Sequence, residues 1–202
     1  MLLRNKFSVL ILIFSFLDSS GQEKRKNLYL STGVFYPIQK IQYENPGFIL
    51  RGVNTVYGHF VGLETKNRIS SSNFGVNGFL GLNQLFQKNT FVDINKTSSK
   101  YGNYIYLDIR ISGSYSIKKK YGLNLGAESN TLLLNINSDY VKNFKEPKVF
   151  VFTPFVKISR DLSNKSISLF YNHGITSLDR VTTVRADFII SKIGVAMDFK
   201  LK

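Results

Sequence analysis

The sequence predicts an all-β fold, an eight-stranded antiparallel up-and-down transmembrane β-barrel. Three observations lead to this prediction. Apolar and polar residues alternate in long runs, long and short connections follow each other in turn, and charged residues share one face of the runs. Side chains on a strand point to opposite faces with a period of two, so each run has an apolar side and a polar side. The chain has 202 residues, the size of one domain.

The first 21 residues have the layout of a secretory signal peptide. Arg4 and Lys6 precede an uninterrupted, mostly apolar run at 7–17, and small residues follow up to Gly21. This run is shorter than the ~20 residues that a membrane-spanning helix needs. We therefore expect cleavage near Gly21, which leaves 22–202 as a single barrel domain.

Eight runs in the mature chain read as strands, and no stretch there has helical spacing. Most of the runs are longer than the ~5–6 residues typical of strands in soluble proteins, and they reach the ~9–11 residues that a tilted strand needs to cross a bilayer. The predicted strands are 27–36, 56–68, 74–86, 103–117, 121–134, 149–161, 166–176 and 186–201.

The connections between these strands are long and short in turn. The short ones are 69–73, 118–120 and 162–165, and the long ones are 37–55, 87–102, 135–148 and 177–185. Outer-membrane barrels have short turns on the periplasmic side and longer loops outside. The pattern predicts that both chain ends lie in the periplasm.

The fourth run, 104-YIYLDIRISGSYSI-117, shows which face meets lipid. Its odd positions are mainly isoleucine and leucine, while Asp108 and Arg110 lie at even positions. An Arg or Lys side chain on the lipid face near mid-membrane costs ~2–4 kcal/mol. We therefore expect Asp108 and Arg110 to point into the barrel and the aliphatic row to point outward.

The fifth run, 121-YGLNLGAESNTLLL-134, repeats this pattern and suggests an interior ion pair. If 118–120 is a tight turn, Arg110 lies opposite Glu128, and opposite charges directly across a strand pair attract. Such a pair offsets part of the cost of enclosing each charge. The interior polar network predicted from all runs is Glu64, Lys66, Asp108, Arg110, Glu128 and Lys157, and Lys192 and Asp198 are also expected to face inward.

Small residues on the polar face favour a crowded interior. An eight-stranded barrel is only just wide enough to be filled by its own side chains, whereas aqueous channels need ~16–18 strands. The small residues expected on the inner wall are Gly58, Gly62, Gly75, Gly81, Ser112, Ser114, Ser116, Gly122 and Gly126. We expect a plugged barrel.

Aromatic residues near the predicted strand ends are typical of the two girdles at the membrane interfaces. They are Tyr29, Tyr36, Tyr57, Phe91, Tyr101, Tyr104 and Tyr121.

Several segments resemble a known family. Lys192, Gly194, Met197 and Phe199 match the C-terminal signal by which outer-membrane barrels are recognised for insertion, which implies the barrel-assembly machinery as a partner. The segments 106–128 and 170–178 are similar to the central hairpin and penultimate strand of small porin-family, OmpA-like or PorT-like barrels. In this chain Arg110 stands where proline is frequent and His173 where an aromatic is usual. The resemblance implies the bacterial outer membrane, with its lipid and lipopolysaccharide, as location.

No catalytic, cofactor or metal site is predicted. Cysteine is absent, and no phosphate loop, zinc spacing or calcium loop occurs. Barrel enzymes that deacylate lipopolysaccharide use a His-x-Ser pair, but the second residue after His173 is Ile175. Both His59 and His173 lie at odd positions, which we assign to the lipid face or the interface. We expect a protein that is not an enzyme.

The charge and the loops indicate a class of function. The net charge is +14, but the basic residues are dispersed apart from 24–26 and 118–120. Export argues against nucleic acid as a partner, and such runs are solvated turns or attract anionic lipid head groups or phosphorylated polysaccharide. We expect a monomer that acts through its longer loops in surface interaction or envelope maintenance. The alternatives are an exported soluble lipocalin-like barrel that binds a small apolar ligand, and a barrel accessory to a secretion machine.

Overall fold

The computed structural model describes residues 27–43, 53–69, 72–93, 96–117, 120–136, 150–174, 177–181 and 186–201. The signal peptide predicted at 1–21 lies outside these residues. The strands are β1 (Asn27–Tyr43), β2 (Val53–Arg68), β3 (Phe74–Asp93), β4 (Lys96–Ile117), β5 (Tyr121–Asn135), β6 (Phe150–Leu162), β7 (Lys165–Asn172), β8 (Ser177–Val181) and β9 (Ala186–Lys200). Within the described part of the chain, no helix is long and apolar enough to cross a membrane.

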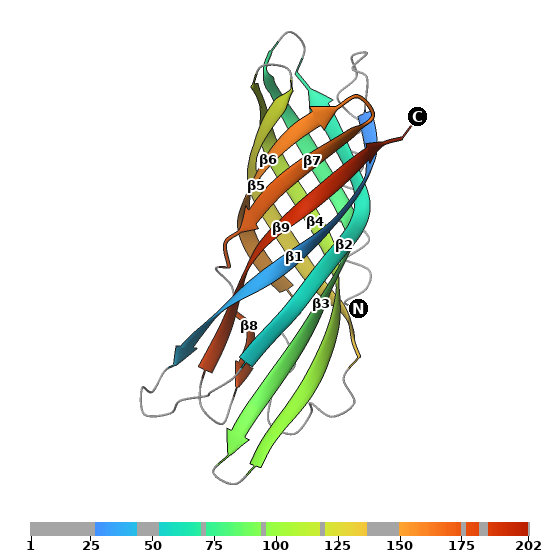
Figure 1. The fold of residues 1–202 in the computed structure, drawn as a ribbon. Helices are drawn as coiled ribbons and strands as arrows, with labels where there is room; N and C mark the ends of the chain where they lie inside the picture. The colour runs from blue at the N-terminus through green and yellow to red at the C-terminus, as the bar shows by residue number, and fades with distance from the viewer. Residues whose placement is uncertain are drawn as a thin grey trace, which may run out of the picture.

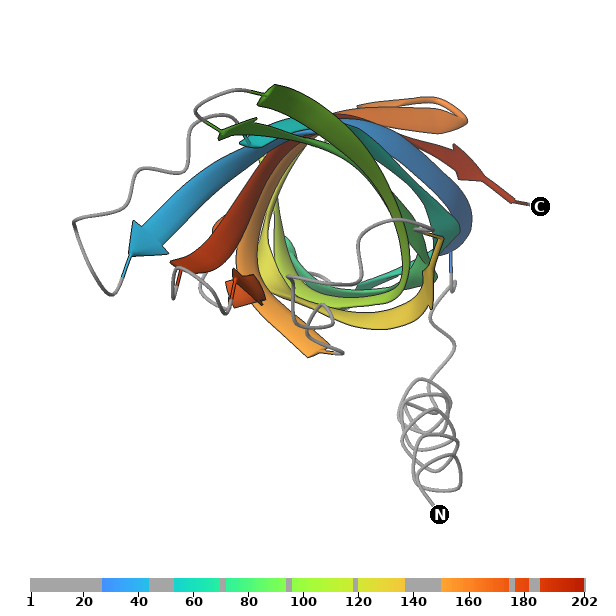
Figure 2. The same ribbon diagram turned by 90° about the horizontal axis from the view of Figure 1, so that it is seen from below.

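The strands form a closed antiparallel ring. Strands β1 to β7 pair in chain order, β7 pairs with β9, and β9 pairs with β1. The short strand β8 pairs with β9 at Ala186–Ile189, beyond the part of β9 that pairs with β7. Strands β7 and β8 therefore act as one interrupted strand, and the wall has the eight strand positions that the sequence predicts (Figures 1 and 2).

One end of the barrel carries the short connections, the start of β1 and the end of β9. Tyr29 near the start of β1 pairs with Lys200 at the end of β9, and the links β2–β3, β4–β5 and β6–β7 lie at the same end. This is the upper end in Figure 1. At the opposite end β3 and β4 extend furthest (Figure 1). We call these the turn end and the far end.

The predicted connection at 87–102 is wrong, because β3 and β4 continue as a paired hairpin to Asp93 and Lys96. Strand β1 likewise continues to Tyr43 and β2 begins at Val53, both inside the predicted connection at 37–55. Backbone hydrogen bonds extend a hairpin without any alternation of side chains, which is required only where one face is apolar. Residues 137–148 of the remaining long connection lie outside the described part.

The predicted strand at 166–176 is also wrong at its end, because β7 stops at Asn172. The N–H of Gly174 donates to the Ser191 hydroxyl over 3.0 Å, so a side chain takes the place of a ladder partner there. The strand resumes as β8 at Ser177, within the predicted connection 177–185.

The wall has a polar inside and an apolar outside, as expected from the fourth and fifth runs. Asp108 and Glu128 are fully buried, whereas Ile111 and Leu125 on the same strands are 55% and 59% exposed. Along β7, exposed and buried residues alternate without interruption. The predicted orientation of the strands is therefore confirmed.

Glycines on the inner wall let aromatic rings lie close to the backbone. Gly62 and Gly81 pair across β2 and β3, and the Phe79 ring lies over both. A Cβ atom at Gly62 would lie 2.7 Å from Phe79 Cζ. Because such a contact is too short, the small residues at these positions make the room in which the interior rings pack.

Candidate functional site

The candidate site is the interior of the barrel, where eight charged side chains form ion pairs. We call them the interior ionic network: Glu64, Lys66, Asp108, Arg110, Glu128, Lys157, Lys192 and Asp198. They comprise four carboxylates and four cations, so their formal charges cancel. The six residues singled out from the sequence all belong to this network, together with Lys192 and Asp198.

Glu128 is the acceptor at the centre of one half of the network. It lies opposite Arg110 in the β4–β5 register, and its Oε2 is 3.0 Å from Arg110 Nε. It also accepts hydrogen bonds from Lys192, Asn172 and Asn130, the last over 2.6 Å. Each of its two oxygens thus faces two donors, from four different residues.

Arg110 is enclosed by aromatic rings as well as by carboxylates. Its guanidinium also pairs with Asp108 on the same strand. The guanidinium carbon lies 4.1 Å from the centre of the Phe60 ring and 4.4 Å from that of Phe79. A cation over an aromatic face is attracted by the quadrupole of the ring, more strongly when it is desolvated. The rings therefore fill space and stabilise the charge together.

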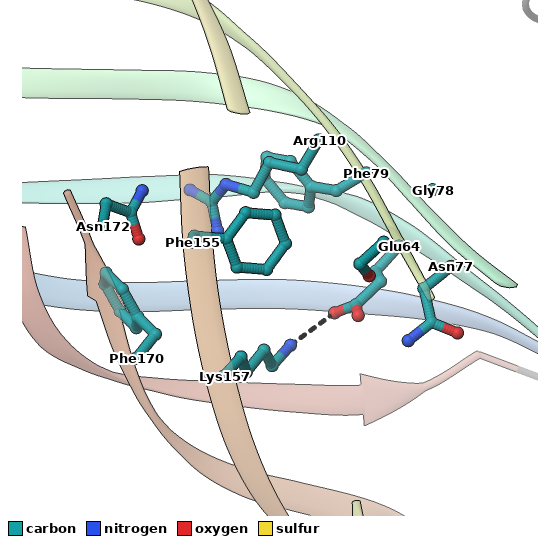
Figure 3. Close-up of a pocket in the computed structure, with 10 residues that line it drawn as sticks. Glu64, Asn77, Gly78, Phe79, Arg110, Phe155, Lys157, Phe170 and Asn172 are labelled. Atoms are coloured by element: carbon teal, nitrogen blue, oxygen red, sulfur yellow. Dashed lines mark hydrogen bonds and ion pairs between the residues drawn. The ribbon is translucent and has the colours of Figure 1, made fainter. Parts of the chain in front are cut away.

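Asp198 is the centre of the other half of the network. Lys66 Nζ lies 2.8 Å and Lys157 Nζ 3.1 Å from its Oδ2. Its two neighbours across the strands, Ser31 on β1 and Ser166 on β7, donate their hydroxyls over 2.6 and 2.8 Å. Lys157 also pairs with Glu64 over 2.9 Å and so joins Asp198 to Glu64 (Figure 3).

A small pocket lies among the side chains of the interior ionic network. Figure 3 shows a pocket between Glu64, Lys157, Arg110 and the rings of Phe79 and Phe155. Its volume of about 20 Å³ holds roughly one water molecule. The pocket is too small for a substrate, and Glu64 and Lys157, which line it, are already paired with each other.

Neither histidine belongs to a chemical site in the described part of the chain. His59 stacks on Phe86 with ring centres 5.9 Å apart, and Nδ1 of the exposed His173 lies 3.0 Å from the Tyr171 hydroxyl. Among the described residues, no three His, Cys, Asp or Glu side chains are placed to hold a metal ion.

The outer wall carries an aliphatic band between two groups of aromatic residues. The turn-end group is Phe74, Tyr115, Tyr121 and Phe199, and the far-end group is Tyr36, Tyr57, Phe86, Phe152 and Tyr171. The band between them exposes Val34, Val61, Leu63, Leu82, Ile111, Leu125, Ile158, Leu169, Ile193 and Val195. The large apolar side chains of the described strands thus encircle the barrel.

Two of the residues assigned to the girdles are placed wrongly by the sequence. Tyr104 is 2% exposed and packs inside against Tyr106. Tyr29 also faces inward, with Lys66 Nζ 4.4 Å from the centre of its ring. Both residues lie at inward positions of the alternation along their strands. This position in the alternation, and not the nearness to a strand end, determines which face of the wall the side chain lies on. Tyr36, Tyr57 and Tyr121 do face outward, and the side chains of Phe91 and Tyr101 lie outside the described part.

The four residues of the C-terminal pattern divide between the two faces of β9. Lys192 reaches Glu128 inside the barrel, and a Cβ atom at Gly194 would touch the rings of the interior. Phe199 is exposed on the outer wall, in the turn-end aromatic group, and Met197 lies on the same face.

Sequence reasoning singled out only part of the interior. Asn77 bonds Asn124 and Asn83 bonds Asn130, each over 3.0 Å. The interior also holds an aromatic cluster that includes Phe35, Phe60, Phe79 and Phe170. The parity of these residues could have revealed them, since each lies two or four positions from a charged or small residue of the inner face.

Comparisons with known proteins find similar solved structures only. No family model matches the chain, and no curated protein matches it. The crystal structure of Ail, the attachment invasion locus protein of Yersinia pestis, is 11% identical, with a TM-score of 0.43, over 86% of this chain and 99% of that one. The backbone structure of Ail in a phospholipid bilayer nanodisc is 11% identical, with a TM-score of 0.39, over 87% and 100%. The NanC porin is 9% identical, with a TM-score of 0.30, over 87% and 100%.

Proposed function

We propose that the mature chain is a small outer-membrane β-barrel protein with a filled interior. The observation that supports this most directly is the polarity of the wall. Four carboxylates and four cations are paired inside, while the aliphatic rows of the described strands face outward. In water this arrangement would leave a large apolar surface exposed, whereas in a bilayer both faces have a suitable environment.

The height of the apolar band fits a bilayer. On β4, ten residue steps separate Ile105 from Tyr115 in the turn-end aromatic group. At ~3.3 Å per residue these steps span ~33 Å along the strand, or ~25 Å along the barrel axis at a tilt of ~40°. The apolar belt of outer-membrane barrels is also ~25 Å tall.

The lipocalin-like alternative requires a wall in which the polar and apolar faces are exchanged. There the aliphatic rows would line a cavity and the charged rows would meet water. Leu125 and Leu169 instead face outward at 59% and 64% exposure, and Asp108 and Glu128 are fully buried. The orientation of the two faces in the described strands is therefore the reverse of the one that a soluble carrier needs.

The filled interior favours a binding or structural role over transport or catalysis. The charged side chains inside pair with one another, and the pocket beside them holds about one water molecule. We propose that contacts with other molecules come from the far end, where β3 and β4 extend beyond the aromatic group to Asp93 and Lys96. The role would be surface interaction or envelope maintenance by a monomer that the barrel-assembly machinery inserts through β9.

Electrophoresis of the membrane fraction with and without boiling tests this proposal. A folded barrel resists detergent and migrates differently until it is heated, so the expected result is a heat-dependent shift of a band found in the membrane fraction. Recovery of the folded mature chain from the soluble fraction, without detergent, would contradict the proposal.

A further inference from the structure

Two cations lie side by side on the outer wall at the turn end, and no carboxylate of the described residues forms an ion pair with either. Arg160 on β6 and Lys165, the first residue of β7, both lie in the outward rows of their strands, and both are exposed. We call them the rim pair. In the register Arg160 lies opposite Ile167 and Lys165 lies opposite Leu162, so the two cations are diagonal neighbours on one face. Diagonal neighbours are ~7–8 Å apart, close enough for long side chains to reach the same group.

In the described strands, the outward rows beside the rim pair carry no carboxylate. Asp161 lies between the two cations in sequence, but it pairs with the buried Ser166 and so has the inward parity. Lys120 precedes β5 next to this site and is exposed. Like charges held this close repel each other unless an anion lies between them. The site is therefore suited to an anionic group.

An aromatic hydroxyl completes the polar part of the site. Tyr121 lies directly opposite Arg160 in the β5–β6 register, and the Arg160 guanidinium carbon is 5.9 Å from the centre of its ring. Tyr121 belongs to the turn-end aromatic group, which marks the level of lipid head groups in the proposed orientation. A phenol, a guanidinium and an ammonium are all able to donate hydrogen bonds to phosphate oxygens.

Directly below the rim pair the wall is apolar. Ile167 lies opposite Arg160, and Ile158 and Leu169 continue the same face at 58% and 64% exposure. On the other side of β7, Lys165 lies opposite the exposed Phe199. Two cations above an exposed aliphatic surface match a molecule with an anionic head and hydrocarbon tails.

We propose that the rim pair is a binding site for an anionic phospholipid, an inference that rests on the proposed membrane location. The headgroup phosphate binds between Arg160 and Lys165 with the Tyr121 hydroxyl as a third donor. The acyl chains lie along Ile158 and Leu169. In this orientation the lipid belongs to the periplasmic leaflet, where the turn end emerges.

Lipid retention measured by native mass spectrometry tests this site. The folded protein is taken from bilayers of phosphatidylcholine and phosphatidylglycerol in equal amounts, and the lipids that stay bound are counted. We expect the wild-type chain to retain phosphatidylglycerol preferentially. Each cation near a membrane surface adds about fivefold to such a preference, so Arg160→Gln/Lys165→Gln should lower it roughly thirtyfold.

A matched control removes the same charge from the far end. Lys96→Gln/Lys100→Gln acts on β4 beyond the apolar band and should leave the preference within about twofold of the wild-type value. Equal retention of the two lipids by the wild-type chain would overturn the proposal without any variant. An equal loss in both double variants would overturn it too, because the effect would then come from net charge. A chain that inserts into bilayers without lipid preference refutes only this site, whereas a chain that does not insert refutes the proposed function.

Discussion

Replacement of Glu128 by glutamine tests whether the interior ionic network holds the barrel together. Glutamine keeps the shape of the side chain but exchanges one carboxylate oxygen for an NH₂ group. Oε1 faces Lys192 and Asn130, and Oε2 faces Arg110 and Asn172. Whichever oxygen is exchanged, the new NH₂ group faces two hydrogen-bond donors and can accept from neither.

The expected loss of stability is large. A hydrogen bond to a charged group contributes about 1.5–3 kcal/mol, so two lost bonds cost roughly 3–6 kcal/mol. The removal of one partner from a buried ion pair costs about 3–5 kcal/mol by independent reasoning. We therefore expect Glu128→Gln to lower the free energy of unfolding by about 4 kcal/mol. A second change, Lys192→Met, removes the cation left without its partner and should restore part of this loss.

Urea unfolding in lipid bilayers, followed by far-ultraviolet circular dichroism, measures the effect. Tryptophan fluorescence is not an option because the chain has no tryptophan. Asp161→Asn is the matched control: this carboxylate is exposed at the turn end, and its change should stay within about 0.5 kcal/mol. The reasoning fails if Glu128→Gln loses less than about 1 kcal/mol, or if Lys192→Met lowers stability further in that background.

Three further predictions concern the two faces of the wall. Gly58→Ala should cost about 1–3 kcal/mol because the three atoms nearest to its new methyl group all belong to the Phe35 ring, and Phe35→Leu should relieve most of this cost in a double-mutant cycle. Leu125→Arg should lower stability in bilayers by about 2–4 kcal/mol, measured by the same urea unfolding; a neutral effect would contradict contact between this face and lipid. His173→Ala should leave the lipid A profile of the cell unchanged in mass spectra, since Tyr171 is the hydrogen-bond partner that the described structure gives its ring; a loss of deacylated lipid A would instead establish catalysis.

The alternation of the sequence was sufficient to predict the arrangement of the wall. Asp108 and Arg110 share a parity with Glu128 across a tight turn, and the register places Arg110 opposite Glu128 as expected. Because a charged side chain in lipid costs free energy, the face of the strand that carries charges must point into the barrel. Where this energetic rule applies, local sequence is enough.

The predictions that were wrong concern segments where the cost of placing a charge in lipid does not decide the structure. At 87–102 the backbone pairing of β3 with β4 continues, and backbone hydrogen bonds leave no trace in the side-chain pattern. The break after Asn172 depends on a bond from Gly174 to Ser191 on β9, a contact between residues distant in sequence. Tyr104 was assigned by its nearness to a strand end, although its parity places it inside. The four-way coordination of Asp198 needs the closed ring and cannot be read from one strand.

Asp198 also bears on how the cylinder is completed during biogenesis. It lies on β9, and its partners Ser31 and Lys66 come from β1 and β2. Until β9 docks, Lys66 and Lys157 lack this shared counter-ion, so a chain truncated before residue 198 would leave the interior ionic network with one more cation than carboxylates. The ionic contacts between the first strands and β9 therefore form only when β9 closes the ring.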